Sequence, residues 1–159
     1  MNITLKNVQV YPRMSEETTA FNATIYLDGK KVGEVKNQGH GGCNFYHWTD
    51  PAKGKEINNW ANAQELEFKF EQLDQIIDKL LFKAEDEKWI AKQTKKQTIF
   101  LLVGDKADSW RTVKAPYTDK VKEFLVGKYG DKLVVIANEN PVKALELMNE
   151  IRNSQSKNQ

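Results

Sequence analysis

The segment from residue 20 to residue 36 constrains the fold most, because its pattern fits a β-hairpin. Apolar and polar residues alternate over residues 20–28, as in a strand with one buried face. Asp28-Gly29 then supplies residues that accept the positive φ of a tight hairpin turn. Residues 31–36 predict the returning strand. We therefore expect an antiparallel sheet in the N-terminal part of the chain.

The other elements predict the α+β fold class. Residues 2–10 indicate a strand with a bulge near Asn7, where the apolar positions change parity. Asp50-Pro51 is typical of a helix start, and residues 70–92 have the strongest helical spacing. The predicted order is βββααββαβα, with later strands at 97–103, 110–114 and 133–137 and later helices after Thr118 (ended by Gly127 and Gly130) and Asn140.

Size and charge limit the possible classes of protein. With 159 residues and 40% hydrophobic content, the chain is long enough for one core. We expect a single compact domain over residues 1–152, with a sub-boundary near residues 93–96. Residues 153–159 lack apolar anchors and predict a flexible tail. The formal net charge of +2 argues against bulk binding of nucleic acid.

The N-terminal sequence and the cysteine content indicate a cytoplasmic protein. Cys43 is the only cysteine, which excludes a disulfide framework within the chain. The longest apolar run, Ile99 to Val103, is far below the ~20 residues that a membrane helix needs. No basic flank followed by an apolar stretch begins the sequence. We therefore expect no membrane partner.

A glycine-rich loop follows the hairpin and is the first candidate for a binding site. Three glycines in four positions let backbone N–H groups turn towards a phosphate or a carboxylate. The loop matches neither the Walker loop nor the dinucleotide fingerprint. An ordinary connection that needs positive φ explains it as well. The candidate ligand-binding residues of this loop are Asn37, Gly39, His40, Gly41, Gly42 and Cys43.

The loop Ser15-Glu16-Glu17-Thr18, which precedes the hairpin, is the second candidate. Its carboxylates and hydroxyls suit a ribose, a cation or acid–base chemistry. The alternative is a turn at the end of a strand. A hairpin returns its chain, so this loop and the glycine-rich loop emerge at the same end of the sheet. We therefore expect the two loops to form one site.

His40, Cys43 and His47 contain both histidines and the only cysteine of the chain. A thiolate with two imidazoles suits zinc, but a structural zinc site normally has four ligands. Chance clustering in an aromatic segment is the alternative. We therefore predict no bound metal and no cofactor, and keep these three residues only as candidate metal ligands.

Basic residues in the C-terminal half could contact phosphates while Trp110 stacks on a base. A solvated sheet edge protected by lysines is the alternative. Arg111 is kept among the candidate ligand-binding residues, because it could add positive charge if this half folds over the site. The group consists of Lys95, Lys96, Lys106, Arg111 and Lys114.

The N-terminal 50 residues resemble a family of small phage and prophage accessory proteins. The resemblance rests on the Ser15-Glu16-Glu17-Thr18 loop, the Asp28-Gly29 hairpin and Gly39-His40-Gly41-Gly42. It implies a protein made inside the bacterial host cell. Small accessory proteins of this kind often counter host defence, by sequestering a nucleotide signal or by blocking a defence protein.

Three functions follow from these observations. The first is sequestration of a phosphorylated small molecule or nucleotide signal without turnover. The second is direct binding of a host defence protein through exposed aromatic residues. The third is a hydrolase, using either zinc on His40, Cys43 and His47 or the carboxylates of Glu16 and Glu17. We also expect a homo-oligomer, because the sheets have edges that could pair.

Overall fold

The computed structural model describes residues 1–156 and confirms the α+β fold class. Its strands and helices follow the predicted order, with one additional strand at residues 45–48. The chain divides into two compact units, Met1–Ala84 (unit 1) and Glu85–Gln159 (unit 2). The division lies within a long helix, upstream of the expected sub-boundary at 93–96. No helix within residues 1–156 has both the length and the apolar character to cross a membrane.

Unit 1 is built on a four-stranded antiparallel sheet in the order β1-β2-β3-β4. The predicted hairpin is confirmed, since Asp28 and Gly29 have φ of 49° and 82°. A shift of register between Lys6 and Gln9, with φ of 52° at Asn7, confirms the predicted bulge. The strands are β1 (Ile3–Val10), β2 (Phe21–Leu27), β3 (Lys30–Asn37) and β4 (Phe45–Trp48).

Strand β4 is missing from the sequence prediction for a physical reason. Its four residues are all aromatic or imidazole side chains, so they show no alternation of polar and apolar types. In the sheet they alternate nevertheless, with Tyr46 and Trp48 packed against the core and Phe45 and His47 exposed. The rings of Tyr46 and Trp48 stack at 5.5 Å.

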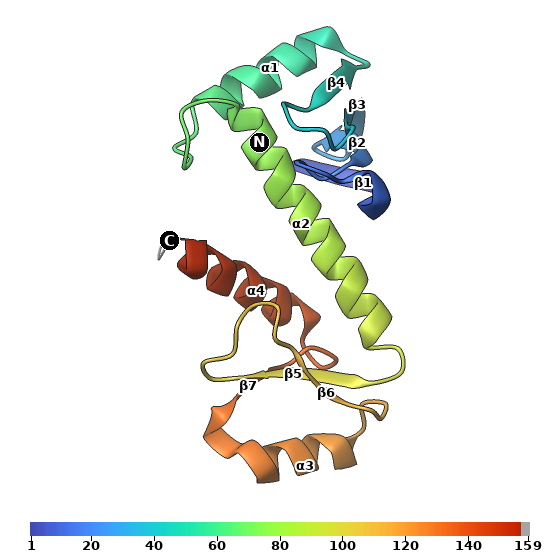
Figure 1. Cartoon of the computed structure of the whole chain (residues 1–159), viewed down its shortest axis with the longest axis vertical. Coiled ribbons are helices and arrows are strands. Elements are labelled where there is room, and N and C mark those ends of the chain that lie inside the picture. Colours follow the sequence, from blue (N-terminus) through green and yellow to red (C-terminus); the bar gives the residue numbers. More distant parts are fainter. Residues whose placement is uncertain (157–159) are drawn as a thin grey trace. The chain divides into compact units, whose positions relative to one another are not determined.

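Helices α1 (Pro51–Asn62) and α2 (Gln72–Gln93) complete the core of unit 1. The predicted cap is confirmed, because Asp50 accepts hydrogen bonds from the N–H groups of Ala52 and Lys53. Both helices pack against one face of the sheet, so the other face has no helix within unit 1 (Figure 1). The shared core includes Phe21, Ile25, Ile57, Leu73 and Ile77.

Unit 2 has a three-stranded antiparallel sheet between two helices (Figure 1). Ile99 and Leu101 pack in the core that contains α4, whereas Phe100 packs with Leu125 of α3. Both faces of β5 are therefore buried, which explains its nearly continuous apolar sequence. The elements are β5 (Thr98–Leu102), β6 (Arg111–Val113), α3 (Asp119–Tyr129), β7 (Leu133–Ile136) and α4 (Pro141–Ser156).

Two helix ends differ from the sequence prediction. Gly127 lies inside α3, and the helix ends at Tyr129 with Gly130 as its C-cap, where φ is 51°. Residues 153–156 of the predicted tail continue α4. The rest of that tail, 157–159, lies outside the described residues. Two short 3-10 helices, Pro12–Met14 and Gly130–Lys132, complete the secondary structure of the described chain.

Candidate functional site

The two loops that flank the hairpin lie side by side in unit 1, as expected from the return of the chain. The carbonyl oxygen of Gly39 accepts hydrogen bonds from the backbone N–H groups of Glu16 at 2.9 Å and Glu17 at 3.1 Å. Gly39 has φ of 87°, and a Cβ at this position would lie 2.2 Å from the carbonyl oxygen of Met14. The close approach of the loops therefore requires glycine.

A network of hydrogen bonds joins the side chains of these loops. The Thr18 hydroxyl donates to Asn37 Oδ1 at 2.8 Å, and the N–H of Gly39 donates to the same oxygen at 2.9 Å. The N–H of Gly41 donates to Thr18 Oγ1 at 3.3 Å. Two of the glycine amides that could hold a phosphate are therefore already engaged within the protein.

The same network continues to helix α2 through Asn44. Asn37 donates from Nδ2 to Asn44 Oδ1 at 3.0 Å. The Asn44 N–H donates to Asp74 Oδ2 at 2.7 Å, and the Tyr46 hydroxyl donates to Asp74 Oδ1 at 2.5 Å. Burial raises the pKa of Tyr46, and the hydrogen bond to Asp74 raises it further. These bonds fix the side chains of β4 and α2 relative to the loops.

The loops and α2 enclose a polar pocket of about 490 Å³, which we call the loop pocket. Among residues 1–156, five carboxylates and no lysine or arginine line it: Glu16, Glu17, Glu71, Asp74 and Asp78. Hydroxyl and amide groups come from Ser15, Thr18, Thr19, Asn37 and Asn44, and apolar contacts from Phe21, Leu81 and Phe82. Two unit charges 4 Å apart near a protein surface interact by about 4 kcal/mol, so the carboxylates disfavour an anion in this pocket.

Asp78 has the most unusual environment among these carboxylates. Burial raises its pKa, the neighbouring charge of Asp74 raises it further, and a hydrogen bond from the Asn44 side chain counteracts the rise only in part. Asp74 and Asp78 are four residues apart on α2, so their side chains are neighbours. A carboxyl group with a raised pKa can donate as well as accept hydrogen bonds.

The side chain of Asn44 is buried beside Asp78. Asn44 is 8% exposed, and its Nδ2 makes no short hydrogen bond but is directed to the carboxylate of Asp78. Among the described residues of unit 1, no other buried side-chain nitrogen or oxygen lacks such a bond.

Several residues predicted from the sequence have other roles. His40 contacts Glu16 through Nδ1 at 3.1 Å, and Cys43 is an exposed free thiol. Arg111 belongs to unit 2, where its Nε donates to Asp105 at 2.9 Å. The hydrogen bond from this guanidinium is the main cause that lowers the pKa of Asp105.

The zinc candidate does not assemble. Within residues 1–156, no group of three or more His, Cys, Asp and Glu side chains is placed to hold a metal ion. His40 lies in the glycine-rich loop, whereas His47 lies on β4 opposite Glu34. The spacing of His40, Cys43 and His47 along the sequence is therefore not matched in space.

Sequence patterns did not identify the pocket residues that come from α2 and the residue before it, or Asn44, which precedes β4. Asp74 and Asp78 belong to a helical segment whose polar face is typical of a solvated surface, and Glu71 directly precedes that segment. The spacing of four between the two aspartates was the available signal. This spacing alone could not identify a site, because it does not show that Asn44 and Tyr46 lie beside Asp74.

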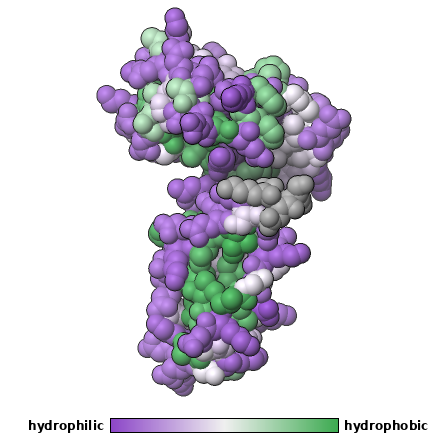
Figure 2. All heavy atoms as spheres, turned by 90° about the vertical axis from the view of Figure 1, so that its left-hand side faces the viewer, coloured by the Kyte–Doolittle hydropathy of each residue, from purple (hydrophilic) through white to green (hydrophobic). Residues whose placement is uncertain are grey.

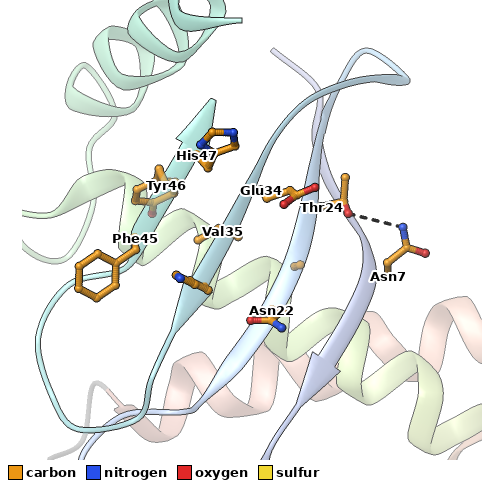
Figure 3. Close-up of a pocket in the computed structure, with 10 residues that line it drawn as sticks. Asn7, Asn22, Thr24, Glu34, Val35, Phe45, Tyr46 and His47 are labelled. Atoms are coloured by element: carbon orange, nitrogen blue, oxygen red, sulfur yellow. Dashed lines mark hydrogen bonds between the residues drawn. The ribbon is translucent and has the colours of Figure 1, made fainter. Parts of the chain in front are cut away.

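A shallow hollow of about 460 Å³ lies on the face of the unit 1 sheet that has no helix. Figure 3 shows His47 on β4 near Glu34 of β3, and Phe45 at the other end of β4. Thr24 of β2 accepts a hydrogen bond from Asn7 at 3.5 Å (Figure 3). Phe45 is 57% exposed, so this face offers a ring for contact with a partner.

Unit 2 has an exposed apolar surface and a hollow of its own. Figure 2 shows apolar residues gathered on one face of unit 2. Its hollow of about 460 Å³ is lined by Trp89 and Trp110, whose rings lie 6.1 Å apart, and by the ion pair of Asp86 with Arg152. Large apolar side chains of unit 2 that are well exposed include Val103, Phe124, Val126 and Val142.

Comparison with known proteins adds no assignment to these sites. No family model, curated protein or solved structure matches the chain. The loop pocket and the open sheet face are therefore the features of the molecule that bear on function.

Proposed function

We propose that unit 1 binds a small hydroxyl-bearing molecule in the loop pocket and holds it without converting it. The observation that carries this proposal is the continuous network from Thr18 through Asn37 and Asn44 to Asp74. Such a network fixes the polar groups of the pocket before a ligand arrives, which lowers the entropic cost of binding. Sequestration of a small molecule inside a phage-infected cell is the biological role that the sequence resemblance suggests.

The ligand expected from the sequence is a nucleotide or another phosphorylated molecule. The hydroxyls of a ribose would suit the carboxylate and hydroxyl groups of Glu17 and Thr18. The phosphate would need donors other than the amides of Gly39 and Gly41, because these amides already donate to side chains. The hydroxyl-bearing part of the expected ligand therefore has more support than its phosphate.

Nuclear magnetic resonance with labelled protein tests this function. Sugars, nucleotides and amines are added one at a time. We expect at least one of them to shift the amide signals of residues 15–19, 37–44 and 71–82. Recovery of that molecule unchanged after incubation would support binding without turnover. A panel without any effect on these signals would reject the proposal, and a chemically altered ligand would indicate an enzyme instead.

The open sheet face favours a second candidate function, the direct binding of a host defence protein. Phe45 projects from this face with more than half of its surface exposed. Exposed aromatic rings often anchor protein interfaces. Capture of a defence protein by the wild-type chain, with loss of capture in Phe45→Ser, would support this function. Equal capture by both proteins would exclude the open face as the interface.

A further inference from the structure

We propose that the loop between α1 and α2 binds the open sheet face of unit 1 in a second copy of the chain. This loop, residues 63–71, is called the aromatic loop, because it carries the exposed rings of Phe68 and Phe70. The open sheet face is the side of the four-stranded sheet without a helix (Figure 1). The inference goes beyond the loop pocket and needs no ligand there.

The aromatic loop exposes its two rings on a backbone that is held in place. Phe68 and Phe70 are 48% and 63% exposed, and their ring centres lie 5.5 Å apart. Nε2 of Gln75 donates to the carbonyl oxygens of Phe68 at 2.9 Å and Phe70 at 2.8 Å, and Oε1 accepts from the Phe68 N–H at 3.3 Å. A loop that is fixed in advance loses little entropy on binding, and exposed apolar patches mark interaction sites.

The aromatic loop is also acidic, which identifies the charge of its partner. Three glutamates, Glu65, Glu67 and Glu71, stand against one lysine, Lys69. All four are exposed, and no ion pair within residues 1–156 includes them. This charge favours a basic protein surface as the partner, whereas an anionic membrane would repel the loop.

The open sheet face has the complementary charge. Lys6 lies opposite Thr24 in the register, and Lys36 lines the hollow of this face. Both lysines are exposed, and none of the ion pairs of the described residues includes either. Glu34 is the only acidic residue of strands β1 to β4, and Lys31 neutralises it at 2.7 Å. The face therefore has an excess of positive charge.

The hollow of the open sheet face also offers a contact for an aromatic ring. Its volume is about 460 Å³, and Phe45, Lys36 and His47 contribute to its lining. Phe45 lies opposite Lys36 in the register of β3 and β4. A ring of the aromatic loop would therefore meet Phe45, while a glutamate beside that ring would meet Lys36.

The position of the aromatic loop makes this contact head to tail. Helices α1 and α2 both pack on the covered side of the sheet, so the loop between them lies on the other side of unit 1 from the open face (Figure 1). Two copies joined in this way retain one free loop and one free face. The assembly therefore grows beyond a dimer as the concentration rises.

Sedimentation equilibrium of two variants, alone and mixed, tests this arrangement. Phe70→Ser removes a ring of the loop, and Phe45→Ser removes the ring of the face. We expect the wild type to exceed the mass of a dimer at high concentration and each variant to associate at least tenfold more weakly. An equal mixture should form a dimer and nothing larger, because the intact face of one variant binds the intact loop of the other.

Controls separate this contact from general stickiness. Phe124→Ser removes a similarly exposed ring from α3 of unit 2 and should leave the association within a factor of two. Lys36→Glu should weaken the association at least fivefold, and added salt should weaken that of the wild type, because salt screens charge attraction. Circular dichroism shows that each variant is folded.

Several results would overturn the inference. A wild-type chain that is monomeric at its highest soluble concentration would do so, and capture of a defence protein through Phe45 would then leave the second candidate function standing. A mixture of the two variants that stays monomeric would show that the loop does not bind the face. An equal loss in Phe124→Ser would indicate nonspecific apolar attraction. Binding of the monomer to neutral lipid vesicles through Phe70 would assign the loop to a membrane.

Discussion

In unit 1 the sheet has helices on one face, whereas in unit 2 the sheet lies between α3 and α4. This difference determines where polar groups can gather. β5 of unit 2 has apolar neighbours on both sides and contributes almost only to packing. The unit 1 sheet leaves one face without a helix of its own unit. At one end its loops and α2 form the loop pocket, so the chemistry proposed here belongs to unit 1.

The largest expected effect tests the two kinds of sheet surface. Ile99 is fully buried in β5, so Ile99→Ala should lower the free energy of unfolding by about 2–5 kcal/mol. His47 is exposed on the open face of unit 1, so His47→Ala should change it by less than about 0.5 kcal/mol. Urea denaturation of both variants measures these values. Similar losses would show that the open face is covered in solution.

The next prediction concerns the contact between the two loops that flank the hairpin of unit 1. Gly39→Ala should lower the free energy of unfolding by about 3 kcal/mol, the upper end of the range for a residue with a strained backbone. The effect is at the upper end because the added Cβ would also collide with the carbonyl oxygen of Met14. Gly42 has the same φ of 87° but open space around it. Gly42→Ala should therefore cost only about 1 kcal/mol, from the backbone conformation alone.

Thermal denaturation compares the two glycine variants. The hydrogen bonds from Glu16 and Glu17 to Gly39 depend on the close approach, so Gly39→Ala should also weaken any ligand of the loop pocket. Equal destabilisation by both variants would mean that the contact between the loops adds nothing beyond the cost of positive φ.

Two helical glycines give opposite predictions in the two units. A Cβ at Gly54 of α1 would lie 2.5 Å from the ring of Trp48, so Gly54→Ala should destabilise unit 1 by about 1–3 kcal/mol. A Cβ at Gly127 of α3 would have no neighbouring atom within 4 Å. Gly127→Ala should stabilise unit 2 by about 0.5–1 kcal/mol, because glycine has a greater entropic cost in a helix.

Hydrogen exchange resolved by peptide assigns these changes to each unit. Slower exchange in unit 2 for Gly127→Ala and faster exchange in unit 1 for Gly54→Ala are the expected results. Stabilisation by both substitutions would show that Trp48 moves aside without cost.

The smallest expected effect concerns the pH dependence of unit 1. The pKa of Asp78 is raised above its ordinary value of 3.8, so the folded state holds this proton more tightly than the unfolded state. The contribution of Asp78 to stability therefore falls as pH rises from the ordinary pKa through the raised one. Asp78→Asn removes this fall, so its stability relative to the wild type should be greater at pH 7 than at pH 3.

Melting temperatures of wild type and Asp78→Asn between pH 3 and pH 7 measure this difference. Glu67→Gln provides the control, since Glu67 is exposed and should show no such dependence. A relative gain that does not change with pH would contradict the assigned environment of Asp78. If Asp78→Asn is more stable than the wild type but binds a pocket ligand less tightly, the charge of Asp78 lowers the stability of unit 1 while it contributes to binding.

Local sequence patterns were sufficient for most of the fold. The Asp28-Gly29 turn, the Asp50 cap and the change of parity near Asn7 each depend on neighbouring residues, and each is confirmed. Strand β4 was missed because aromatic side chains occupy both of its faces. The neighbourhood of the two loops was also predictable, because a hairpin brings its ends together.

The loop pocket shows where the sequence was insufficient. Residues 15–18 and the glycine-rich loop were identified as neighbours, but their hydrogen bonds use the amides that a phosphate would need. Asp74 and Asp78 follow the last residue of the glycine-rich loop, Cys43, by 31 and 35 positions, and no periodicity relates the two segments. Packing of α2 against the sheet brings these carboxylates to Asn44, and burial then raises the pKa of Asp78. Neighbouring residues in the sequence determine the turns and helix caps. The charge and chemistry of the pocket arise instead from contacts between segments that are distant in the sequence.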